Sequence, residues 1–202
     1  FLLAMTICFT IVVAPASMAE PTDVTVRVIS KDAKFIGSSM GGVRITLSDT
    51  RTGEVLASGL TRGGTGDTSK IMHTDGGRRM RMADDSAASF EARIDVEEPR
   101  LIEAEAYGPL DYPDSAHRVT ATQWVVPGHD LSVGDGWVLE MPGFVVDVVE
   151  PAEYARINAD GGRVPVTAKV MMMCGCPIEP DGLWDANRYE ITMTVAHDGE
   201  TS

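Results

Sequence analysis

Catalytic signatures are missing from this 202-residue chain, and only three of its residues are cysteines. Neither a Gly-x-Ser-x-Gly nucleophile motif nor a His-Glu-x-x-His zinc motif is present, and no glycine loop of the phosphate-binding kind occurs. The four histidines are scattered, without the spacing of metal ligands. We therefore expect a protein that is not an enzyme.

Positive charge is also scarce. Lys and Arg number 17 against 30 Asp and Glu, which gives a formal net charge of −13. Phosphate backbones and anionic membrane surfaces attract proteins through basic patches. The charge balance therefore argues against a nucleic-acid partner, and it leaves a protein or a small ligand as the open choices.

Residues 1–19 carry no charged side chain and begin with an almost wholly apolar run of 13 residues. A membrane-spanning helix needs about 20 apolar residues, and the small residues at 17 and 19 suit a signal peptidase. We predict a signal peptide over residues 1–19, cleaved before Glu20, with no stable membrane span afterwards. The mature chain is then periplasmic, secreted or at the cell surface; a retained anchor is the alternative.

Helical periodicity is nearly absent, whereas many short segments alternate between apolar and polar residues with a period of two, the pattern of strands with one solvent-facing side. In the first of them, Thr25 and Arg27 occupy the side expected to face solvent. One helical turn is expected over residues 151–158, after a proline. The fold class is all-β, with strands predicted at 24–28, 43–47, 54–57, 90–96, 101–107, 119–126, 137–141, 144–149, 164–173 and 189–196.

Two interruptions divide the strands. Residues 59–85, rich in Gly, Thr, Asp and Arg, predict a long loop or a ragged hairpin, and Pro142-Gly143 separates two apolar runs. We therefore predict two tandem immunoglobulin-like β-sandwich domains, at 20–141 and 142–202. The second is expected to be incomplete, because such a sandwich needs about seven strands, and Asp198-Gly199 resembles a hairpin turn without its return strand. The expected cores are Val24, Val28, Ile45, Leu47, Phe90 and Ile94 in the first domain, and Phe144, Val166, Val170, Ile191 and Val195 in the second.

Residues 41–59 read GGVRITLSDTRTGEVLASG. A strand of the form GV-x-V-x-L that leads through a TG turn resembles the opening hairpin of bacterial carboxypeptidase-regulatory-like and related immunoglobulin-like modules. The resemblance implies a sandwich that supports, spaces or presents other domains. It assigns no functional residue to this chain.

The most distinctive segment reads Met-Met-Met-Cys-Gly-Cys, over residues 171–176. Thioether and thiolate sulfurs are soft ligands that select Cu(I). In an extended strand, the even-numbered residues of this segment share the apolar face, and the odd-numbered methionines are expected to face solvent. The candidate metal ligands are Cys174, Cys176, Met172, Met171 and Met173.

Two other interpretations of this segment remain open. Free cysteine and methionine are common core residues, so the segment can be structural. The two cysteines can also form a disulfide or a redox pair, if Gly175 bends the chain enough to bring them together.

Residues 177–187 (PIEPDGLWDAN) form an acidic loop with a tryptophan. An aromatic platform with carboxylates can hold a sugar or a peptide, so the candidate recognition residues are Glu179, Asp181, Trp184 and Asp185. The alternative is a tryptophan that folds back to cap the sandwich.

These patterns together predict an exported, non-catalytic binding or accessory protein that handles a soft metal such as Cu(I). A cell-surface structural or adhesion module with no metal site is the alternative function.

Overall fold

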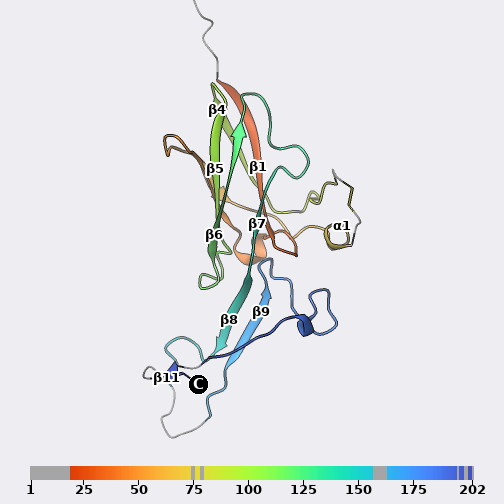
Figure 1. The fold of residues 1–202 in the computed structure, drawn as a ribbon, viewed down its shortest axis with the longest axis vertical. Coiled ribbons are helices and arrows are strands. Elements are labelled where there is room, and N and C mark those ends of the chain that lie inside the picture. The colour runs from red at the N-terminus through yellow and green to blue at the C-terminus, as the bar shows by residue number, and fades with distance from the viewer. Residues whose placement is uncertain are drawn as a thin grey trace, which may run out of the picture.

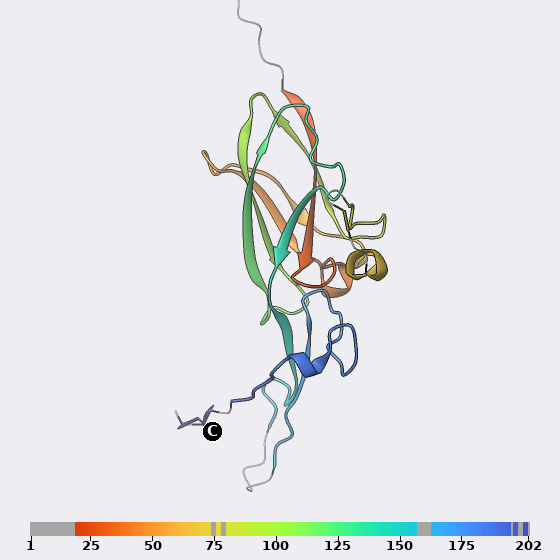
Figure 2. The same cartoon turned by 45° about the vertical axis from the view of Figure 1, so that its right-hand side comes forward.

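The computed structural model describes residues 19–73, 76–77, 80–156, 163–194, 196–197 and 200–201. Seven of its strands form two sheets that enclose a common core (Figures 1 and 2). The first sheet has the order β4-β1-β7, formed by Phe90–Val96, Glu20–Ser30 and Trp137–Met141. The second has the order β3-β2-β5-β6, formed by Val55–Leu60, Arg44–Asp49, Arg100–Gly108 and His117–Val125. The predicted all-β class is confirmed.

Strand β1 organises the first sheet. It pairs antiparallel with β4 and parallel with β7, so that Val26 lies opposite both Phe90 and Trp137. All pairs in the second sheet are antiparallel. A parallel neighbour cannot follow through a tight hairpin, and the chain forms β2 to β6 before it returns as β7.

The main core lies between these two sheets. Of the residues expected in the first core, five are buried there: Val24, Val28, Ile45, Leu47 and Ile94. Phe90 is half-buried against the same core. Each fully buried apolar side chain of this size contributes about 1.5–3 kcal/mol to folding. The period of two in the sequence therefore predicted the core of this sandwich correctly.

Residues 61–73 and 80–89, here called the covering segment, lie over the outer face of the first sheet. Residues 59–85 were expected to form a loop or hairpin, but they include the short helix α1 (Thr68–Met72). The Asp67 carboxylate caps the start of this helix by accepting a hydrogen bond from Lys70 N at 2.7 Å. Beneath the covering segment is a second apolar cluster, formed by Phe35, Ala83 and Ala87.

The outward side of β1 is therefore not solvent-facing, and that prediction is wrong. Thr25 and Arg27 are both buried. The alternating pattern gave no sign of this, because it reports the polarity of a face and not what packs on it.

Strands β8 (Phe144–Glu150) and β9 (Thr167–Met172) form a separate two-stranded ribbon at one end of the sandwich (Figure 1). Val145 and Met173 anchor it in the main core. Most of its apolar side chains are exposed, including Phe144 and Val146. The tandem arrangement of two sandwiches is not seen in the described residues.

The predicted second core is wrong. Phe144, Val166 and Ile191 are exposed, Val170 is half-buried, and residue 195 lies outside the described residues. The physical reason is that β8 and β9 pair only with each other, so no second sheet covers their open face within the part of the chain that the structure describes.

The C-terminal strands also differ from expectation. Residues 189–194 are not a strand, and residues 151–156 contain a turn but no helix; residues 157–158 are outside the described part. Ala196–His197 pairs antiparallel with Glu200–Thr201. The remaining short elements are η1 (Ser38–Met40), η2 (Ala186–Arg188), β10 (Ala196–His197) and β11 (Glu200–Thr201).

The predicted signal peptide, residues 1–19, lies outside the described residues except for its last residue. Among the helices that the structure describes, none has the length and apolar character needed to cross a bilayer.

Candidate functional site

The sulfur-rich segment forms a tight turn where the ribbon meets the sandwich. Cys174 and Cys176 are joined by a disulfide, with their Cα atoms 5.5 Å apart. Gly175 lies between them at φ 79°, a left-handed conformation that glycine adopts without a steric penalty. Its N–H donates to the carbonyl of Met172 at 2.8 Å, and Met172 N donates to the carbonyl of Cys176 at 3.0 Å. The backbone therefore closes the turn that the disulfide spans.

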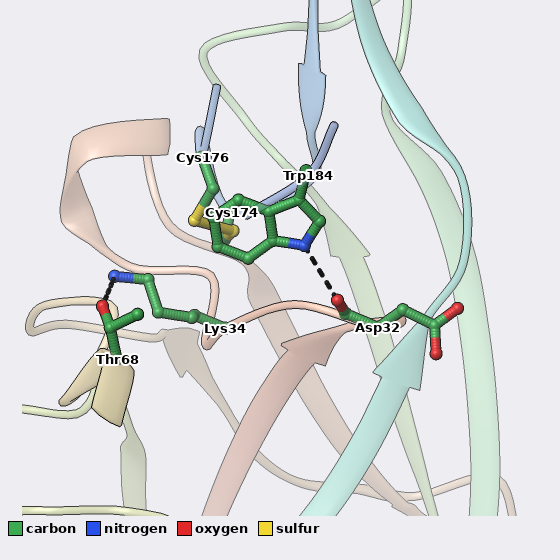
Figure 3. Close-up of a disulfide and its surroundings, with 6 residues drawn as sticks. All are labelled: Asp32, Lys34, Thr68, Cys174, Cys176 and Trp184. Carbon is green, nitrogen blue, oxygen red and sulfur yellow. Dashed lines mark hydrogen bonds between the residues drawn. A yellow bond between two sulfur atoms is a disulfide. The ribbon is translucent and has the colours of Figure 1, made fainter. Parts of the chain in front are cut away.

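Trp184 covers this disulfide (Figure 3). The indole is only 8% exposed, and its Nε1 donates to the backbone carbonyl of Asp32 at 2.9 Å. Beside it, Lys34 Nζ donates to Thr68 Oγ1 at 2.9 Å (Figure 3). The contact residues come from the turn after β1, the end of β9 and the loop before η2, so this cluster fastens the C-terminal part of the chain to the sandwich.

The five candidate sulfur ligands divide between two clusters. Met172 packs with Cys174 and Cys176, as strand parity predicted. Met171 is half-buried and Met173 fully buried, and both pack against the main core. Their predicted exposure is wrong, because the core of the sandwich extends under this end of β9. In the disulfide the cysteines carry no thiolate, which is the form that binds a metal.

Within the described ranges, no cluster of three or more His, Cys, Asp or Glu side chains has an arrangement that could hold a metal ion.

The acidic loop is held by its own carboxylate. Asp185 Oδ1 accepts hydrogen bonds from Asn187 N at 3.0 Å and from Asp181 N at 3.2 Å. These hydrogen bonds lower the pKa of Asp185, and the bond from Asn187 N has the largest effect. Glu179 and Asp181 are exposed, whereas the tryptophan of the loop is buried. The loop therefore presents carboxylates to solvent but no aromatic platform, and its tryptophan has folded back.

The sequence pattern did not lead us to an exposed tryptophan on the second sheet, the β3-β2-β5-β6 sheet. Trp124 on β6 is 60% exposed and borders a pocket of about 370 Å³. Its lining residues come from the turn after β2, the start of β5 and the end of β6. These segments meet at the end of the sandwich opposite the ribbon (Figure 1). A signal was available, because Trp124 falls on the otherwise polar side of its alternating strand, in line with Thr120 and Thr122.

Two ion pairs border this pocket, one partly buried and one exposed. Arg100 Nη1 lies 3.3 Å from Asp49 Oδ2, and Arg51 Nη2 lies 3.5 Å from Glu98 Oε1. Asp49 is buried and accepts hydrogen bonds from Arg51 N at 2.7 Å and Thr52 N at 3.1 Å. The Arg51 backbone bond is the largest of the effects that lower the pKa of Asp49, to which the charge of Arg100 adds. The Asp49 carboxylate thus stays ionised and orients the Arg100 guanidinium.

No protein-family model matches this chain, and neither a curated protein nor a solved structure does so. The fold and the site define its class as a predominantly β protein, built on a two-sheet sandwich with an exposed aromatic pocket at one end and a disulfide-bearing ribbon at the other.

Proposed function

We propose that this chain is an exported, non-catalytic β-sandwich binding or accessory protein that recognises a saccharide at Trp124. The observation that supports the proposal is the exposed indole beside guanidinium and carboxylate groups in one pocket. A flat aromatic ring packs against the apolar face of a sugar ring, while Arg51 and Glu98 supply donors and acceptors for its hydroxyls. The volume of about 370 Å³ falls in the range of small-molecule sites.

Export and architecture are part of the same proposal. The uncharged apolar run of residues 1–19 supports export. The hairpin β2–β3 carries the resemblance to immunoglobulin-like modules that present other domains, and a saccharide-binding accessory module has that kind of role.

The test is a titration of the full chain with cellohexaose, xylohexaose and chitohexaose. Tryptophan fluorescence and calorimetry measure the binding. Trp137 and Trp184 are buried, so the exposed indole dominates the spectral change. We expect saturable binding of one of these oligosaccharides that Trp124→Ala weakens by about tenfold, equivalent to 1.4 kcal/mol, and that Trp124→Phe partly retains.

Tyr154→Ala is the matched control, because it removes an aromatic side chain that is 99% exposed and distant from the pocket in sequence. The saccharide proposal fails if none of the three oligosaccharides binds, or if Trp124→Ala binds as the unaltered chain does.

A second candidate function, Cu(I) handling, is favoured by one observation: Met172 packs with both cysteines. Reduction of the disulfide frees two thiolates beside a thioether, a soft donor set. Under anaerobic conditions, competition with a Cu(I) chelator is expected to show one Cu(I) per reduced chain and none for the oxidised chain or the Cys174→Ser/Cys176→Ser variant. Affinity no tighter than micromolar for the reduced chain would rule out this candidate.

If both titrations fail, the remaining proposal is a structural or adhesion module with no metal site. The resemblance of residues 41–59 to supporting modules favours that alternative.

A further inference from the structure

Arg27 is a buried cation without a bound counter-charge. It lies near the middle of β1, on the outer side of the first sheet, and is only 8% exposed. Its Nη1 donates to the carbonyls of Ala87 at 2.6 Å and Ala88 at 3.1 Å, while its Nε is buried with no hydrogen-bond partner in the structure. Among the described residues, no carboxylate forms an ion pair with it.

Such an arrangement is unfavourable by itself, because neutral carbonyls replace only part of the hydration that a guanidinium loses. Three acidic groups, Asp135, Glu91 and Asp84, act on Arg27 through their charges, and two of them serve other partners. Asp135 accepts from Met82 N at 2.9 Å and Ala83 N at 2.7 Å, and Asp84 accepts from Ser86. The buried charge is therefore compensated only from a distance.

A second arginine increases the local positive charge. Burial lowers the pKa of Arg27 most, and the charge of Arg81 lowers it further. The charges of Asp135, Glu91 and Asp84 raise it, but the net shift is downward. The chain as a whole has a net charge of −13. Two guanidinium groups close enough to repel each other are therefore unusual in it.

These arginines line one pocket of about 540 Å³. Its charged side chains are Arg27, Arg81 and Arg93 against Asp23 and Glu91, and Arg81 Nη2 also lies 3.8 Å from Oδ1 of the exposed Asp85, which is outside the lining. Arg93 Nε lies 3.8 Å from Asp23 Oδ1, and both side chains are exposed. An exposed pair of that length is weak, so Arg93 can turn to a ligand at little cost.

We propose that this pocket binds an oxyanion, a carboxylate or phosphate group carried by a small ligand, with Arg27 as the buried anchor and Arg81 and Arg93 at the rim. The guanidinium fork matches both groups through paired hydrogen bonds. The site belongs to the first sheet, so it is independent of the saccharide proposal at Trp124 on the second.

The first experiment measures thermal stability of the full chain with inorganic phosphate, with succinate, and with NaCl at matched ionic strength. A ligand that binds only the folded state raises the melting temperature by mass action. We expect a saturable rise with phosphate, succinate or both that exceeds the rise with NaCl. A response to one anion alone identifies that group as the ligand chemistry.

The variants locate the effect. Arg81→Gln/Arg93→Gln is expected to weaken the apparent affinity by about tenfold. Arg44→Gln/Arg118→Gln removes the same charge from around Tyr107 on the second sheet and is expected to respond as the unaltered chain does. Arg27→Met is expected to fold, since it relieves a buried charge, and to lose the anion response.

An NMR titration gives a readout at the anchor itself. The Arg27 Nε–H signal is expected to shift on addition of the same anion and to saturate at the same concentration. The proposal is overturned if neither anion exceeds NaCl, or if both double variants respond equally.

Discussion

At the scale of single residues, the structure depends on a few positions where backbone geometry or charge leaves little choice. Gly175 is one, because its positive φ lets the chain turn between two bonded cysteines. Asp49 is another, because its buried carboxylate closes the β2–β3 turn and holds Arg100 beside Trp124. Both positions yield predictions.

Gly175→Ala is expected to lower the free energy of unfolding by more than the about 1–2 kcal/mol that a left-handed alanine costs. A Cβ there would lie 2.5 Å from Met40 Sδ. Gly53→Ala is the control, since Gly53 has φ 74° with nothing within 4 Å of its Cβ position. Urea unfolding of both variants measures the difference, and equal losses would show that the Met40 contact does not matter.

Asp49→Asn tests the charge of the turn. Because the pKa of Asp49 is lowered in the folded chain from its usual value of 3.8, the ionised carboxylate stabilises the fold above that value, and the contribution disappears as pH falls through the lowered one. The difference in urea midpoint between the unaltered chain and Asp49→Asn is expected to be constant near neutral pH and to shrink below about pH 4. A difference independent of pH would contradict this account.

At the scale of elements, the β8–β9 ribbon shows how differently two neighbours on one strand are used. Val145 is fully buried in the main core, whereas Val146 is 50% exposed. The ribbon therefore relies on one face for its attachment to the sandwich. Its other face, which includes Val148, is exposed, and Phe144 on that face contacts the Tyr189 ring edge-on, with ring centroids 5.4 Å apart.

Val145→Ala is expected to cost about 2 kcal/mol of stability, because it removes buried apolar atoms and leaves a cavity. Val146→Ala, the same change one residue along, is expected to cost less than about 1 kcal/mol. Urea denaturation of the two variants provides the comparison. Similar losses at both positions would mean that the open face is covered in solution.

At the scale of the whole molecule, burial between sheets rather than cross-linking holds the chain together. The disulfide joins residues only two apart in sequence, so it restricts the unfolded chain little. Both sides of β1 are packed, one by the main core and the other by the covering segment.

Reduction of the disulfide is accordingly expected to leave the sandwich folded and to lower its stability by at most about 2 kcal/mol. Circular dichroism and urea unfolding with and without a phosphine reductant measure this. The Cys174→Ala/Cys176→Ala variant controls for the reductant. Loss of the β signal in reduced protein at neutral pH would show that the junction, and not the core, limits stability.

The sequence by itself determined where the strands of the sandwich lie, although not those of the C-terminal part. The residues predicted at 90–96 and 137–141 form β4 and β7 with the same bounds, and the alternation within β1 and β2 identified the inner core side chains. These features follow from local geometry, because successive side chains of any strand point to opposite faces.

Only the tertiary structure decided what each face meets. It placed Arg27 under the covering segment, buried Trp184 against the disulfide and left Trp124 exposed. It also paired β1 with β7, more than 100 residues later in the chain, and among the described residues it placed no second sheet on the ribbon. Burial and pairing depend on contacts between distant segments, and a local pattern records the polarity of a face but not its partner.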